Sequence, residues 1–141
     1  MKYVQLLVDA NLNNLIDGYK IINNLESLAN EDNNSIDKML IYGFFNYVTK
    51  EELPNVFSLI CSKIRKGGYL EFNMVTLDSI LSIDGRFDNP KGFELEINKL
   101  IPNIKNLPRY SDILKLISDN NMILDTSYKV GYLKNEFSIT R

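Results

Sequence analysis

Histidine is absent from this sequence of 141 residues, and cysteine occurs once, as Cys61. Without histidine, the chain has no Ser-His-Asp or Cys-His catalysis, no histidine-ligated metal and no usual general base near neutral pH. A single cysteine excludes both a disulfide framework and a thiolate zinc site. We therefore expect no metal site, and we expect Cys61 to be a buried, inert thiol in a reducing compartment.

Neither positive nor negative side chains are in large excess. The 16 Lys and Arg residues nearly balance 18 Asp and Glu residues, for a net charge of −2, so no field of the whole chain would hold nucleic acid or an anionic membrane. The first residues lack the apolar stretch of a signal peptide, and no apolar run approaches the length of a membrane span. From these absences we expect the protein to lie in the cytoplasm. Because 45% of the residues are hydrophobic, we expect one domain with a core of its own over residues 1–141.

Short apolar runs typical of buried strands recur along the chain. They lie at residues 3–9, 19–23, 35–43, 69–75, 122–128 and 136–140. The polar stretch 25–34 predicts an irregular connection. The last two runs are too close in sequence for a helical crossover, so we expect them to pair antiparallel, with a turn near Gly131.

Helical patterns separate several of these runs. Thr49 and Glu52 have the spacing of a capping box, and apolar residues then recur at helical spacing to Ile64, which predicts a helix over residues 49–65. Gly67-Gly68 is expected to end this helix through a left-handed cap. A second helix is predicted to begin at Ser111. Glycine and proline predict loops around a short helix or two in residues 76–107.

The stretch from residue 31 to residue 75 resembles part of a known protein family. The segment EDNNSID (31–37) is similar to the (E)DNSFD segment before the fourth strand of many small methyltransferases. Residues 40–48 resemble the strand and turn that follow, and residues 51–70 are similar to the family's EEL…VLKPGG-L helix and turn. The final helix and strand pair, to Thr140, fit as well. The sequence thus resembles the class I S-adenosylmethionine-dependent methyltransferases.

This resemblance implies a Rossmann-like α/β fold: a mostly parallel methyltransferase sheet with an antiparallel C-terminal strand pair and helices on both faces. Between Tyr19 and Leu40 there is room for one strand where the family usually has two, so the second or the third strand of the family is missing. The resemblance also implies S-adenosylmethionine as the cofactor, bound at the carboxyl edge of the sheet.

Seven residues are candidates for cofactor binding: Asp9, Ala10, Asn11, Asn23, Asp32, Asn33 and Tyr42. Asp9 to Asn11 stand where the family has a glycine-rich turn that approaches the cofactor closely. Asp9 fits either a contact with the cofactor's amino acid or a substrate amine, or a simple cap of the turn. Asn23 stands where the family has an acid that accepts two ribose hydroxyls, and a neutral amide is a weaker acceptor.

The remaining candidates each have a structural alternative. Asp32 and Asn33 fit contacts to the adenine edge or a solvated loop. Tyr42, with Phe44 and Phe45, fits a floor for cofactor or substrate, or the hydrophobic core. The charged segment DGRFD (84–88) fits either recognition of a polar substrate or a solvated loop.

Two functions remain open. The first is a methyltransferase that acts on a small molecule or a saccharide, since catalysis in this fold is chiefly positioning and does not require histidine; no catalytic residue is predicted. The second is a non-catalytic methyltransferase-like protein with a structural, binding or assembly role, in a homo-oligomer or with an assembly partner. The missing glycines and the missing acid predict that S-adenosylmethionine binding is weak or absent.

Overall fold

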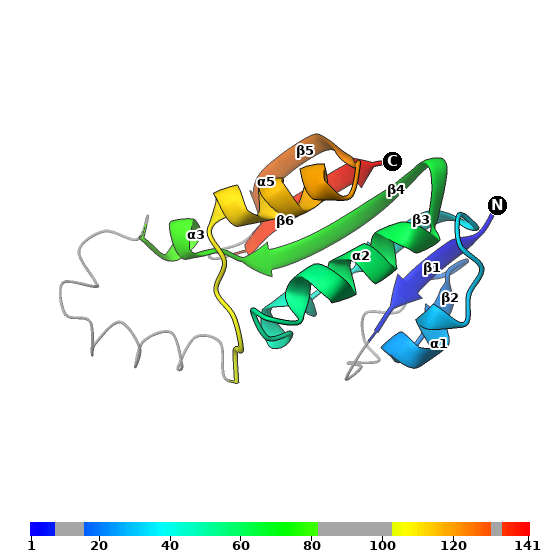
Figure 1. The fold of residues 1–141 in the computed structure, drawn as a ribbon, viewed down its shortest axis with the longest axis horizontal. Helices are drawn as coiled ribbons and strands as arrows, with labels where there is room; N and C mark the ends of the chain where they lie inside the picture. The colour runs from blue at the N-terminus through cyan, green and yellow to red at the C-terminus, as the bar shows by residue number, and fades with distance from the viewer. Residues whose placement is uncertain (8–15, 82–102, 131–133) are drawn as a thin grey trace.

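The computed structural model describes residues 1–7, 16–81, 103–130 and 134–141. Within them lies a six-stranded sheet with the strand order β2-β1-β3-β4-β6-β5 (Figure 1). The strands are β1 (Tyr3–Leu6), β2 (Lys20–Ile22), β3 (Ile36–Ile41), β4 (Ile64–Val75), β5 (Ile123–Val130) and β6 (Lys134–Thr140). Each strand predicted from an apolar run is present, although most ends differ by a few residues.

The pairing of the strands is mixed. β1 pairs in parallel with β2 and with β3, and β3 pairs in parallel with β4. β6 pairs antiparallel with both β4 and β5. This arrangement confirms the predicted α/β fold, with a mostly parallel sheet and an antiparallel pair at the C-terminus. In the centre of the sheet, Lys38 lies opposite Tyr69 and Ile41 lies opposite Phe72.

A helix replaces the irregular connection that we predicted for residues 25–34. Helix α1 (Leu25–Ala29) begins after Asn24, whose Oδ1 accepts a hydrogen bond from the backbone N–H of Ser27 at 2.7 Å. Asparagine is among the best N-cap residues, and the fully buried Leu28 anchors the helix in the core. The prediction was wrong because a helix this short shows no helical periodicity in the sequence.

Helix α2 (Leu53–Lys63) is shorter than predicted at both ends. Thr49 Oγ1 does accept the backbone N–H of Glu52 at 3.2 Å. That bond closes a turn before the helix, and α2 itself starts without a side-chain cap. The helix ends at Lys63 because Ile64 already has extended backbone angles, with φ −75° and ψ 129°.

The Gly67-Gly68 pair lies inside β4 and not at the end of the helix, so its predicted role was wrong. Gly67 has a φ of +82°, a left-handed backbone that favours glycine. At Gly68, a β-carbon would lie 2.8 Å from the carbonyl oxygen of Asp37, closer than carbon and oxygen pack. The pair therefore allows β4 to approach β3 where the register of the two strands shifts between Ile36 and Lys38.

The second long helix, α5 (Tyr110–Asp119), begins before Ser111, the cap that we predicted. Two carboxylates hold its first turn instead. Asp112 Oδ2 accepts the backbone N–H of Arg109 at 3.0 Å, and Asp78 Oδ2 accepts that of Tyr110 at 2.6 Å. Asp78 belongs to the short helix α3 (Leu77–Leu81), which follows β4 as predicted.

The hydrophobic core lies between the sheet and its helices. α2 contributes Phe57 and Ile60, α5 contributes Ile113 and Ile117, and α1 contributes Leu28. These side chains share one cluster with alternate strand residues: Val4, Leu6, Met39, Ile41, Leu70, Phe72, Phe137 and Ile139. Figure 1 shows α2 and α5 on the same side of the sheet. The helices α1, α2 and α5 thus pack into one core on one face of the sheet.

Cys61 is buried in this core, as predicted, and its burial raises the pKa of the thiol to about 12. The thiol is therefore protonated and unreactive near neutral pH. In the described part of the chain, no helix is long and apolar enough to cross a membrane. The same residues contain no group of three His, Cys, Asp or Glu side chains that could hold a metal ion.

Candidate ligand site at the carboxyl edge of the sheet

The carboxyl ends of β1, β2, β3 and β4 meet at one edge of the sheet, because these strands are parallel. Ligands of open α/β sheets bind at such an edge. Leu7 extends the pairing there, since its backbone N–H donates to the carbonyl oxygen of Ile22 at 2.9 Å. Asn23 and Tyr42 follow β2 and β3 directly, so the structure brings these two candidates to the same edge.

Asn23 is exposed, and its side chain makes no hydrogen bond within the described residues. It lines a polar groove of about 390 Å³ together with Lys20 and Ser27. The side-chain oxygen of the neighbouring Asn24 is already used, because it caps α1. Among the described residues, the end of β2 itself thus offers a ligand one neutral amide, and the groove continues along α1 to Glu31.

Tyr42 is half-buried and carries a polar contact. Its hydroxyl donates to Glu71 Oε2 at 2.5 Å, across the β3–β4 pair. Next to it, the backbone N–H of Gly43 donates to Asn73 Oδ1 at 2.7 Å. Glu71 and Asn73 were not among the predicted site residues, and no local sequence signal marks them, since their partners lie about thirty residues away. They add a carboxylate and an amide beside the edge.

Phe44 and Phe45 belong to the hydrophobic core, which was one of the two alternatives predicted for them. Phe45 is 1% exposed, and its ring centroid lies 5.6 Å from that of Phe57 and 5.1 Å from that of Phe72. Phe44 is buried beside it, with the two ring centroids 5.6 Å apart. Neither ring is free to form the floor of a ligand site.

Asn46 lies in the short turn Phe45–Tyr47 that follows β3. Its amide nitrogen donates to the carbonyl oxygen of Val75 at 2.8 Å, and its Oδ1 accepts the backbone N–H of Val75 at 2.7 Å. A second buried amide, Asn106, donates to the carbonyl oxygens of Phe45 and Val48 at 2.6 and 2.7 Å. These bonds hold the turn to β4 and to residues 103–109.

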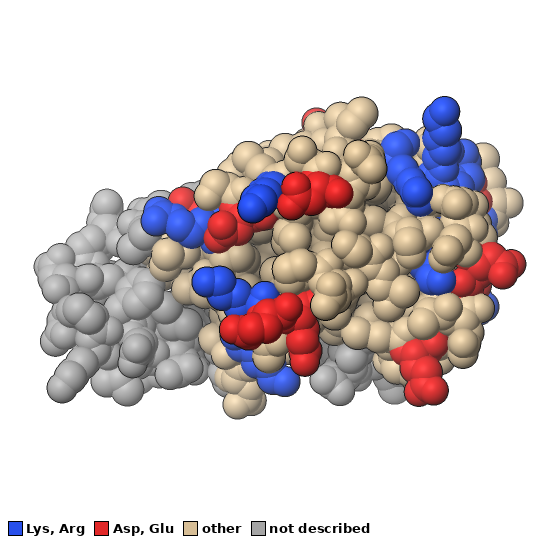
Figure 2. Space-filling view, viewed as in Figure 1, with Lys and Arg blue, Asp and Glu red and all other residues tan. Residues whose placement is uncertain are grey.

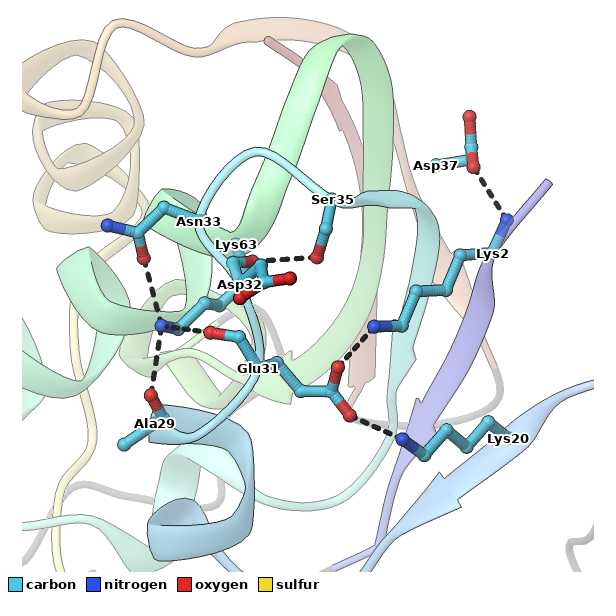
Figure 3. A network of polar contacts seen from close by, with 9 residues as sticks. All are labelled: Lys2, Lys20, Ala29, Glu31, Asp32, Asn33, Ser35, Asp37 and Lys63. Carbon is cyan, nitrogen blue, oxygen red and sulfur yellow. Dashed lines mark hydrogen bonds and ion pairs between the residues drawn. The ribbon is translucent and has the colours of Figure 1, made fainter.

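Asp32 and Asn33 lie at the opposite edge, because α1 returns the chain to the start of β3. Figure 3 shows the loop that carries both, and its Glu31 side chain points toward Lys2 and Lys20, near the beginnings of β1 and β2. Asn33 Oδ1 accepts a hydrogen bond from the buried Lys63 ammonium at 2.9 Å. The structure therefore does not bring Asp32 or Asn33 together with Asn23 and Tyr42.

The same loop is fixed by ion pairs. Glu31 binds Lys2 through one carboxylate oxygen and Lys20 through the other, the latter at 2.5 Å (Figure 3). The hydrogen bond from Lys2, followed by that from Lys20, lowers the pKa of the Glu31 carboxyl. The Lys63 ammonium also donates to the carbonyl oxygens of Ala29 and Glu31, at 3.1 and 2.8 Å. These contacts hold the loop to β1, β2 and the end of α2.

Asp9, Ala10 and Asn11 lie outside the described residues, as does the DGRFD segment. Among the described candidates, the edge therefore keeps Asn23 and Tyr42. The resemblance implies that the ribose hydroxyls of S-adenosylmethionine would meet Asn23 here, a neutral amide with one acceptor oxygen in place of a carboxylate.

No protein-family model and no curated protein sequence matches the chain significantly. Solved structures do match. An S-adenosylmethionine-dependent methyltransferase from Mesorhizobium loti aligns with a TM-score of 0.64 at 12% identity, over 99% of this chain and 81% of that chain. An O-methyltransferase family protein from Burkholderia thailandensis aligns with a TM-score of 0.62 at 16% identity, over 87% of this chain and 36% of that chain.

Magnesium protoporphyrin IX methyltransferase from Synechocystis PCC 6803, with bound S-adenosylhomocysteine, aligns with a TM-score of 0.59 at 15% identity. The alignment covers 87% of this chain and 51% of that one. This chain thus spans between about a third and a half of the length of the Burkholderia and Synechocystis proteins. Together with the strand order, these alignments show that the chain has a class I methyltransferase-like fold.

Proposed function

We propose that this chain is a non-catalytic methyltransferase-like protein, whose role is binding or assembly and does not depend on S-adenosylmethionine. One observation carries the proposal: β2 is followed by Asn23 and Asn24, and the second of these amides is already used as the cap of α1. A carboxylate at this point would accept two ribose hydroxyls with charge assistance, and such bonds are about twice as strong as neutral ones.

Isothermal titration calorimetry of the whole chain with S-adenosylmethionine and with S-adenosylhomocysteine tests the proposal. We expect a Kd weaker than about 1 mM for both ligands, which corresponds to a binding free energy of less than about 4 kcal/mol. Submicromolar affinity for either ligand would overturn the proposal, because it would mean that the pocket meets the cofactor with other groups.

The second candidate function is a methyltransferase that acts on a small molecule or a saccharide. It is favoured by the exposed side chain of Asn23, which makes no hydrogen bond within the described residues and lies at the edge where ligands of this fold class bind. Its test is the release of S-adenosylhomocysteine when the chain is incubated with S-adenosylmethionine and a panel of hydroxylated small molecules and sugars. Turnover above the rate without protein, with any acceptor in the panel, would establish it.

A further inference from the structure

A groove of about 700 Å³ lies between the start of α2 and α5. It is lined by Lys50, Leu53, Pro54, Lys105, Asn106, Leu107, Pro108, Arg109, Asp112, Lys115, Leu116 and Asp119. Its volume is in the range of sites for small organic ligands, about 300 to 1,000 Å³. Neither Asn23 nor Tyr42 belongs to its lining, so it is separate from the carboxyl-edge site.

The middle of the groove is apolar. Leu53 is buried, and Leu107, Pro108 and Leu116 are half-buried around it. Figure 2 shows this face of the molecule, where an uncharged area over α2 and α5 lies between groups of charged side chains. Binding of an apolar group of a ligand here would be favourable, because it would remove apolar surface of both the ligand and the groove from water.

Cations outnumber carboxylates around this apolar middle. The lining contains Lys50, Lys105, Arg109 and Lys115 against Asp112 and Asp119, although the whole chain has a net charge of −2. Asp112 is partly used, since its carboxylate accepts the backbone N–H of Arg109. Within the described residues, the side chains of Lys50, Lys105 and Lys115 have no carboxylate within ion-pair distance.

The wall formed by residues 103–109 is held in place before any ligand arrives. The backbone N–H groups of Lys105 and Asn106 donate to the carbonyl oxygen of Asn46, at 2.8 and 3.2 Å. The backbone N–H of Leu77 donates to the carbonyl oxygen of Pro108 at 2.9 Å. A site that is already formed loses little conformational entropy on binding.

We propose that this groove binds a small organic anion, in which a carboxylate or phosphate group is joined to an apolar body. The anionic group would contact the ammonium groups of Lys105 and Lys115, and the apolar body would lie on Leu53 and Leu116. A cationic rim around an apolar floor suits this ligand class, because each part of the ligand meets its complement. The inference goes beyond the proposed function and holds whether or not the carboxyl edge binds S-adenosylmethionine.

Fluorescence titration with 8-anilinonaphthalene-1-sulfonate, an anion with an apolar body, tests the proposal on the whole chain. We expect saturable binding at one site, and at least about tenfold weaker binding for the double variant Lys105→Glu/Lys115→Glu, since charge reversal replaces attraction by repulsion. The matched control is Lys66→Glu, an exposed lysine of β4 outside the groove, which should bind within about twofold of the wild type. Thermal unfolding of each variant shows that it is folded.

Competition then identifies the anionic group: octanoate displacing the probe supports a carboxylate ligand, and octyl phosphate displacing it supports a phosphate ligand. Equal binding by the wild type and the double variant would overturn the proposal, as would an equal loss in the control. Binding of an acidic, leucine-containing peptide alone, with no binding of the probe or of either competitor, would also overturn it, because the groove would then take a protein partner.

Discussion

Asn46 and Val75 are joined by two hydrogen bonds, so the Asn46 side chain pairs with the end of β4 as a neighbouring strand would. The amide nitrogen donates at 2.8 Å and Oδ1 accepts at 2.7 Å. Both residues are buried, at 5% and 3% exposure. Since the backbone of Asn46 also accepts the N–H groups of Lys105 and Asn106, this contact supports the carboxyl edge and the wall of the groove at once.

The Asn46→Ala variant should therefore lose stability. The change removes three buried hydrogen bonds, two with the backbone of Val75 and one to the carbonyl oxygen of Asn106, which should lower the free energy of unfolding by about 2 to 4 kcal/mol. Urea denaturation followed by circular dichroism measures the loss. Asn55→Ala, at an exposed position of α2, is the control and should change stability by less than about 0.5 kcal/mol. A loss of that small size for Asn46→Ala would show that the side chain does not hold the strand end.

The Gly68→Ala variant tests the close approach of β4 and β3. A β-carbon at this position meets the carbonyl oxygens of Asp37 and Ile36 at 2.8 and 3.0 Å, so backbone must move, at a cost of about 1 to 3 kcal/mol. Gly18→Ala serves as a comparison. Gly18 has a φ of +86° but nothing within 4 Å of the added carbon, so it reports the cost of left-handed backbone alone, a cost that Gly68 does not carry because its φ is not positive. A Gly68→Ala variant whose free energy of unfolding is unchanged would contradict the steric explanation.

The structure and the sequence pattern differ in which residue caps the start of α5. Asp112→Ala removes the carboxylate that accepts the Arg109 N–H and should cost about 1 kcal/mol, as the loss of an N-terminal cap does. Ser111→Ala, at the residue that the pattern favours as the cap, should cost less than about 0.5 kcal/mol because its hydroxyl caps nothing. Denaturation midpoints of the two variants decide between them, and the reverse order would place the helix start at Ser111.

The strands could be predicted because each is a compact apolar run, and the order of the central ones follows from the helix that joins β3 to β4. The ends of the helices could not be predicted from the sequence, since they depend on contacts between residues that are far apart in the chain. Ile64 leaves the helix to pair with Ile36, and Asp78 caps α5 from another element. Neither partner is close in sequence.

The site could be predicted only in part, for the same reason. Asn23 and Tyr42 follow strands directly, so strand direction alone places them at the carboxyl edge. Asp32 and Asn33 matched a family segment, but α1 carries the chain back to the opposite edge before they are reached. Asn106 lies 60 residues from Asn46, and no local pattern indicates that contact.

Protonation of Glu31 should make the protein less stable as the pH is lowered. Its carboxyl pKa is lowered by Lys2 and Lys20. A carboxyl whose pKa is lower in the folded state contributes stability above its unfolded value, about 4.3, and loses that contribution as the pH falls through the folded value. The Glu31→Gln variant should thus lose less stability than the wild type between neutral and acid pH. Glu26→Gln, at an exposed residue of α1, is the control and should follow the wild-type curve. Denaturation midpoints measured across this range would contradict the prediction if the Glu31 and Glu26 variants behaved alike.

Asn23→Asp should restore affinity for S-adenosylmethionine, if the neutral amide is what weakens it. A carboxylate accepts through two oxygens with charge assistance, and such a bond adds about 1.5 kcal/mol, which is about tenfold in Kd. Asn24→Asp is the matched control, because aspartate also caps helices well but its side chain would stay on the Ser27 N–H. Calorimetry should therefore show tighter binding for the first variant and none for the second. Equal heats for both variants would mean that the end of β2 does not contact the ribose, and that the cofactor is excluded by another part of the edge.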